Sequence, residues 1–189
     1  SRIALAENRI ADAINDAHRL GDRYPDNGVH RLRLASLYSL DKRPRKAIDI
    51  LSSVLESDPK NVAVLRSRGD ALLSVGDHSA AIVDYEAAVE AIGNIELIEA
   101  DEQQKREAAG VYNNLSWVLA TSPNDSVRDG KRALELAEKA AKLSDYQEAH
   151  ILSTLGAAYA ETGDFETAIE WSQKAVDLGA ADQHEQLEQ

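Results

Sequence analysis

Carboxylates and imidazoles are the side chains of this sequence that could do acid–base or metal chemistry. There are 33 Asp and Glu residues and 5 His, but no Cys. Two His ligands on one helix must stand four residues apart to hold zinc, and no two of these His do. Carboxylate pairs this frequent on helices are typical of a solvated face rather than of a general acid and base. The sequence therefore predicts no metal site and no cofactor.

Nucleophile and phosphate-binding motifs are a second source of chemistry. The Gly-x-Ser-x-Gly turn that exposes a nucleophilic serine does not occur in the sequence. Gly130-Lys131 is similar to the end of a phosphate-binding loop. However, Asp125 stands where that loop needs its first Gly, and Arg132 stands where it needs Ser or Thr. We therefore predict that the protein is not an enzyme.

The acidic balance of the chain limits its partners. Against the 33 acidic residues there are 21 Lys and Arg, for a formal net charge of -12. A field of this sign repels nucleic-acid phosphates and anionic lipid surfaces. No apolar run approaches the roughly 20 residues that span a bilayer. We predict protein or peptide partners, no nucleic acid and no membrane insertion.

The elements that position these side chains are indicated by composition and by an internal repeat. Ala occurs 30 times, whereas Phe, Trp and Tyr together occur nine times, a profile typical of closely packed helices. Residues of matching type also recur 34 positions apart, as in repeat proteins. The pairs are Pro25 and Pro59, Ala35 and Gly69, Ala47 and Ala81, Leu51 and Tyr85, and Val54 and Ala88.

Each repeat is predicted to hold two amphipathic helices. Between residues 28 and 60, apolar residues are spaced by three and four on either side of a break at 41–44. Pro44 suits the first turn of the second helix, where a missing N–H costs nothing, and Pro59 ends that helix. In the next repeat, Gly76 and Asp77 form the turn between the two helices.

These features make the chain similar to the tetratricopeptide repeat family, whose 34-residue unit pairs two helices through large and small residues at set positions. In the last unit the matching residues are Leu152, Leu155, Gly156, Tyr159, the turn Gly163-Asp164-Phe165, Ala168 and Ala175. The resemblance covers nearly the whole chain. It implies an all-α fold, a right-handed superhelical solenoid of antiparallel helix pairs.

The small residues have a physical role in such pairs. A side chain larger than a methyl group would hold two crossing backbones apart, so we expect the helices to cross at Ala35, Gly69 and Gly156. Large side chains are expected to fill the space beside each crossing, namely Tyr38, Tyr85 and Tyr159.

The repeat register divides residues 1–189 as a single array. Residues 1–27 hold the second helix of an incomplete leading unit, units follow at 28–61, 62–95, 96–145 and 146–179, and a C-terminal cap starts at 180–189. In the third unit, the small residue Ser116 lies 47 rather than 34 positions after Gly69. We expect a longer first helix in that unit and a longer turn before Ala133.

The third unit also carries a resemblance of its own. The sequence from Asn114 to Pro123, followed by Arg128 to Ala133, is similar to a variant unit found in bacterial tetratricopeptide proteins. This resemblance implies a bacterial origin, and a soluble protein of either the cytoplasm or the periplasm. Because the chain begins at Ser1 rather than at Met, we expect its native start to be missing.

In this family, the first helices of successive units line a concave groove. By register, the resemblance implies a peptide-binding set: Arg33, Ser36, Arg66, Asp70, Asn113, Asn114, Trp117, His150 and Thr154. Asn amides can bond a peptide backbone as donor and acceptor, Arg can pair with a carboxylate, and Trp is a frequent interface anchor. The competing interpretation is that these residues solvate helix faces or pack against the longer helix.

One ligand known for this family is excluded by the residues present. Chaperone adaptors of the family hold a C-terminal carboxylate with a clamp of Lys, Asn, Asn, Lys and Arg. The matching positions are Leu32, Ser36, Ser67, Gly110 and Asn114, of which only Asn114 fits. We predict a non-catalytic protein-interaction scaffold that binds an extended peptide or a partner helix. The alternatives are a structural or oligomerisation segment, such as a homodimer, or a regulatory segment of a larger multidomain protein.

Overall fold

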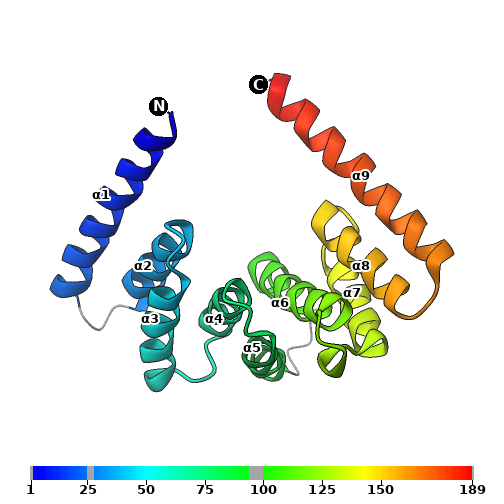
Figure 1. Ribbon diagram of the computed structural model, residues 1–189, viewed down its shortest axis with the longest axis horizontal. Coiled ribbons are helices and arrows are strands. Elements are labelled where there is room, and N and C mark those ends of the chain that lie inside the picture. The colour runs from blue at the N-terminus through cyan, green and yellow to red at the C-terminus, as the bar shows by residue number, and fades with distance from the viewer. Residues whose placement is uncertain (1, 25–27, 94–99, 189) are drawn as a thin grey trace. The chain divides into compact units, whose positions relative to one another are not determined.

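In the computed structural model, the chain is helical throughout the parts that the structure describes, which are residues 2–24, 28–93 and 100–188. Helices follow one another as antiparallel neighbours and no strand occurs in these ranges (Figure 1). The expected all-α fold of paired helices is therefore confirmed. The chain forms two compact units, Ser1–Ala91 and Ile92–Gln189.

The first unit is built from five consecutive helices. They are α1 (Arg2–Arg23), α2 (Gly28–Leu40), α3 (Pro44–Ser57), α4 (Val62–Ser74) and α5 (His78–Ile92). Among them, α1 packs on α2, α2 on α3, and α3 on α4. Residues 25–27, which include Pro25 of the repeat pattern, lie outside the described residues.

The helix ends of this unit follow from local chemistry. Pro44 is the first residue of α3, and α3 ends at Ser57, two residues before Pro59. The side chain of Asn61 then caps α4, accepting a hydrogen bond from the Val64 N–H at 3.1 Å. Gly76 turns the chain between α4 and α5 with φ +83°, a left-handed conformation that glycine adopts without strain. These predicted breaks are confirmed.

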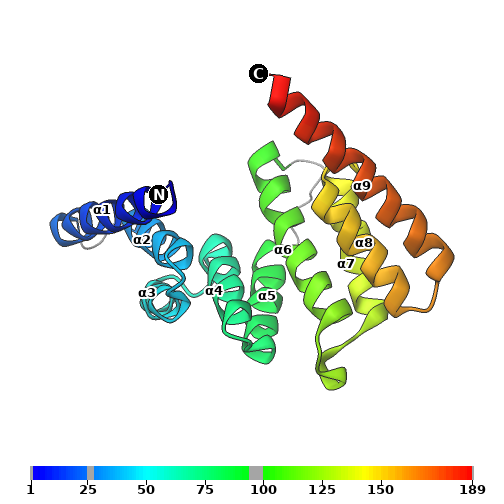
Figure 2. The same cartoon turned by 45° about the horizontal axis from the view of Figure 1, so that its top comes forward.

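The described residues of the second unit form four α-helices and one short 3₁₀ helix. They are α6 (Glu102–Thr121), η1 (Asp125–Val127), α7 (Gly130–Leu143), α8 (Ala149–Glu161) and α9 (Phe165–Glu188). In this unit α8 packs on both α6 and α7, and α9 packs on α8, as Figure 2 shows. Four alanines of α7 have no accessible surface: Ala133, Ala137, Ala140 and Ala141.

The first and last α-helices of the second unit, α6 and α9, are longer than the helices between them. With 20 residues, α6 is longer than α2, α4 and α8, which have 13 each. It begins with a capping box between Asp101 and Gln104, and residues 94–99 before it lie outside the described residues. Helix α9 continues to Glu188 without a break at 180, where a cap was expected to start, so the division into repeats stays a prediction.

The two predicted crossing glycines both lie at close contacts, but with different neighbours. A Cβ on Gly156 would lie 2.6 Å from Ser172 Oγ and 3.1 Å from the Ala168 carbonyl oxygen, so the backbones of α8 and α9 do approach closely. A Cβ on Gly69 would instead lie 2.5 Å from Cε1 of Tyr85. At Gly69 the small residue therefore makes room for a ring, whereas the sequence analysis expected a second backbone there.

Candidate functional site

Four of the predicted binding residues lie on α2 and α4 of the first unit. Arg33 is exposed and Arg66 is half-buried. The Ser36 hydroxyl donates to the Leu32 carbonyl oxygen of its own helix at 3.0 Å. Asp70 accepts a hydrogen bond from the Tyr85 hydroxyl at 2.6 Å, so this carboxylate helps to hold the ring that covers Gly69.

A buried ion pair beside these residues was missed by sequence reasoning. The Arg68 guanidinium donates to both carboxylate oxygens of Asp84, at 2.6 and 2.7 Å, and to the Ser52 hydroxyl at 3.1 Å. The hydrogen bond to Asp84 raises the pKa of Arg68 above its ordinary value. Asp84 stands three residues after Ala81 and four before Ala88, which places it in the buried stripe of α5. That spacing is the signal that could have found it.

Three further predicted residues lie together on α6 in the second unit. Asn113 is only 8% exposed, and its Nδ2 donates to Asn114 Oδ1 at 3.1 Å. The other amide atom, Asn113 Oδ1, is buried and has no hydrogen-bond partner. One turn further along, the Trp117 side chain is 45% exposed. This stretch of α6 therefore combines an unsatisfied amide oxygen with an accessible aromatic ring.

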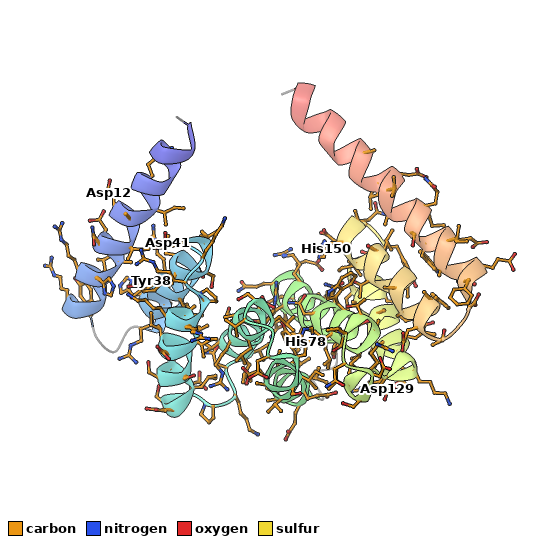
Figure 3. The ribbon with its side chains drawn as sticks, in the orientation of Figure 1. Asp12, Tyr38, Asp41, His78, Asp129 and His150 are labelled. Atoms are coloured by element: carbon orange, nitrogen blue, oxygen red, sulfur yellow. The ribbon has the colours of Figure 1, made fainter. Side chains whose placement is uncertain are left out.

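The last two predicted residues lie on α8 but face different surroundings. His150 is exposed on the first turn of α8 (Figure 3), with Nδ1 3.6 Å from a carboxylate oxygen of Glu148. Thr154 is only 3% exposed, and its hydroxyl donates to the His150 carbonyl oxygen at 3.1 Å. It shares a helix face with the buried Ile151 and Ala158, so Thr154 lies in the interior rather than on an accessible surface.

A surface pocket of about 580 Å³ borders this region. We call its central residues the terminal face: Ser153, Ala157 and Ala160 of α8 with Phe165, Ile169 and Val176 of α9. Trp117 of α6 also lines the pocket. It therefore joins the terminal face to Asn113 and Asn114, which we call the Asn113 region. Sequence reasoning placed Trp117 in the groove but missed the α9 side of this face, although the spacing of the apolar residues on α9 is that of a helical stripe.

The long turn between α6 and α7 is held by one arginine. The Arg128 guanidinium pairs with Asp125 at 2.6 Å and with Glu161 at 3.0 Å, and donates to the Ser122 carbonyl oxygen at 2.9 Å. The hydrogen bond to Glu161 raises the pKa of Arg128. Because Glu161 is the last residue of α8, this arginine ties the turn to the neighbouring helix pair.

Within residues 2–24, 28–93 and 100–188, no three His, Asp or Glu side chains gather in a way that could hold a metal ion. Nor does any helix in these ranges have the length and apolar content that crossing a membrane requires.

Comparisons with known proteins place this geometry in a family. Family models described as "Tetratricopeptide repeat" match residues 4–71 and 126–183. DnaJ homolog subfamily C member 3 of Bos taurus is 35% identical over 92 residues, which are 46% of this chain and 18% of that protein. The same protein of Mus musculus is 43% identical over 58 residues, 31% of this chain and 12% of its own length. The chain thus spans less than a fifth of these relatives.

Solved structures show the same fold at low sequence identity. A crystal structure of MamA has a TM-score of 0.68 and 20% identity, covering 95% of this chain and 94% of that one. MamA from Desulfovibrio magneticus RS-1 has a TM-score of 0.64 and 18% identity, covering 95% and 91%. Yeast Tom70 has a TM-score of 0.69 and 19% identity, covering 94% of this chain and 34% of Tom70. The chain belongs to the tetratricopeptide repeat family.

Proposed function

We propose that this chain is a non-catalytic protein-interaction scaffold that holds a segment of a partner protein, extended or helical, against α6 and α8. Membership of the family supports a scaffold role in general. The observation that carries the finer proposal is the group formed by Asn113, Asn114 and Trp117 on α6, with the exposed His150 on α8.

The unsatisfied oxygen of Asn113 favours a ligand that supplies a donor. A buried polar atom without a partner costs about 1–3 kcal/mol, so a native structure keeps one where something else satisfies it. A backbone N–H of a bound segment is such a donor for the Asn113 Oδ1. Amide side chains suit an extended peptide because they can both donate and accept.

Trp117 supplies the apolar part of the proposed site. A large aromatic side chain buries about 150–250 Å² when it is covered, and such anchors dominate binding energies at interfaces. Thr154 and Asp70 make internal hydrogen bonds, so we do not give either a direct role in holding the partner.

An array of immobilised extended peptides of varied sequence tests this proposal. We expect Trp117→Ala to weaken binding at least about tenfold, a loss of about 1.4 kcal/mol. Tyr24→Ala is the matched control, because Tyr24 is 48% exposed against 45% for Trp117. Asn113→Ala should weaken binding while changing the free energy of unfolding by less than about 1 kcal/mol, since it removes an unsatisfied group.

Two results would contradict the proposal. One is peptide binding that is indifferent to the changes at Asn113, Asn114 and Trp117. The other is a stable dimer, seen by sedimentation, that Trp117→Ala dissociates, because then a second copy would occupy the proposed site.

A further inference from the structure

Three large apolar side chains of the terminal face are mostly exposed on α9. Phe165 is 66% exposed, Ile169 70% and Val176 64%, all on one side of α9. The α8 side of the pocket offers only small residues, namely Ser153, Gly156, Ala157 and Ala160. A row of small residues beside a ridge of large ones is a surface into which a helix can pack.

The same face is covered by a helix elsewhere in the chain. Counting from the crossing alanines Ala168, Ala133 and Ala47, the residues equivalent to Val176 are Ala141 on α7 and Leu55 on α3. Ala141 is 0% and Leu55 7% exposed, because α7 packs against α8 and α3 packs against α4. The first helix of a following pair is thus the occupant that this face takes in both units.

The charges beside the terminal face indicate which helix it would accept. Glu166, Glu170 and Asp177 are exposed on α9 at spacings of four and seven, so they form one stripe along the edge of the apolar ridge. Lys174 stands among them, with its Nζ 4.0 Å from the centroid of the Trp171 ring, so the stripe carries three acidic side chains and one basic one. This stripe is acidic and the chain has a net charge of -12. A second copy of the chain would bring like charges together, whereas a helix flanked by Lys or Arg would meet opposite ones.

We infer that the terminal face docks a helix of a partner protein, with a small apolar contact surface and a flank of Lys or Arg. The helix lies against α8 and α9 as α8 lies against α6 and α7. This goes beyond the proposed function, because the terminal face is a different surface from the Asn113 region and meets it only at Trp117.

Two synthetic helical peptides provide the probe. Both carry the buried side chains of α8, namely Ile151, Leu152, Leu155 and Ala158. One peptide has Lys at the remaining flank positions and the other has Glu. We expect the Lys peptide to bind the intact chain at least about tenfold more tightly than the Glu peptide at low salt. The difference should shrink as salt is added, because exposed charges are then screened.

Substitutions on the terminal face locate the peptide. The double variant Ile169→Ser and Val176→Ser should weaken binding of the Lys peptide at least about tenfold. Val83→Ser is the control, since Val83 is equally exposed, at 67%, but lies on α5. Circular dichroism and thermal unfolding check that both variants remain folded.

Charge reversal and a distant variant complete the test. Glu166→Lys with Glu170→Lys should reverse the preference between the two peptides. Asn113→Ala should leave binding of the Lys peptide unchanged, which separates this inference from the proposed function. The inference is overturned if neither peptide binds, if both bind alike, or if Ile169→Ser dissociates a dimer of the chain.

Discussion

The helix pairs α4/α5 and α6/α7 place a small residue at the same point of the first helix but hold it by different chemistry. In α4/α5, Gly69 lies under the ring of Tyr85, whose hydroxyl is bonded to Asp70. In α6/α7, the small residue is Ser116, which is fully buried and donates to the Ala133 carbonyl oxygen at 2.8 Å.

The difference teaches that the same small-residue position can be held by different contacts in two helix pairs of one chain. Pair α4/α5 is wide enough for an aromatic ring and also contains the Arg68–Asp84 ion pair. In pair α6/α7, the alanines of α7 pack closely against α6. The Ser116 hydroxyl there takes the place of both the Tyr85 ring and the ion pair. The first pair therefore depends on a few strong polar contacts, and the second on close packing and one hydrogen bond.

The largest effect is expected from Arg68→Ala in α4/α5. This change leaves the Asp84 carboxylate, only 4% exposed, without its cation. Removing one partner of a buried pair costs about 3–5 kcal/mol, so the free energy of unfolding measured with urea should fall by that amount. Arg66→Ala, two residues away and half-buried, is the control. Equal losses for both variants would show that the ion pair stabilises nothing.

Gly69→Ala should have the next largest effect. The new methyl group would meet a Tyr85 ring that is 0% exposed, and overpacking of this kind costs about 1–3 kcal/mol, which exceeds the gain of about 1 kcal/mol in helix propensity. Gly156→Ala should cost less, because the shortest contact is with the hydroxyl of the exposed Ser172, which can rotate away, and the backbone contacts at 3.1 Å and 3.3 Å need only a small shift between α8 and α9. Thermal unfolding compares the two variants. A lower melting temperature for Gly156→Ala would reverse this interpretation.

Ser116→Ala tests the hydrogen bond that distinguishes α6/α7. Losing this buried bond should lower the free energy of unfolding by about 1 kcal/mol. The matched control is Ser153→Ala, since Ser153 lies on α8 and is exposed. If Ser116→Ala is as stable as the parent chain, packing alone holds the α6/α7 crossing.

The smallest effect is a pH dependence that arises in α6/α7. Burial raises the pKa of Tyr112 above its ordinary value of 10.0, more than the charge of Arg132 lowers it. Because the folded chain holds this proton more tightly than the unfolded chain does, the contribution of Tyr112 to stability is constant below about pH 10 and is lost as the pH rises from there through the raised pKa. Phenolate absorbance measures the pKa of Tyr112, and urea unfolding at a series of pH values measures the free energy of unfolding. In Tyr112→Phe the fall in stability should be smaller, and an identical fall would contradict the assignment.

Much of the local structure could be predicted from the sequence. The 34-residue spacing indicated helix pairs, and Pro44, Pro59 and Gly76 marked helix ends where they occur. These features act over a few residues, because proline lacks an N–H and glycine tolerates positive φ. The candidate site was less predictable. Trp117 is exposed, whereas Thr154 is buried, although the same register implied both residues.

The sequence by itself determined the all-α class, the pairing of helices and the acidic net charge of the chain. Only the tertiary structure decided that Arg68 meets Asp84, that Asn113 keeps an unpaired oxygen, and that the apolar side chains of the terminal face are exposed among the described residues. The physical reason is the distance along the chain over which each property is set. Periodicity and helix ends depend on neighbours along the chain, whereas burial, ion pairing and free surface depend on which helices pack together and at what rotation about their axes.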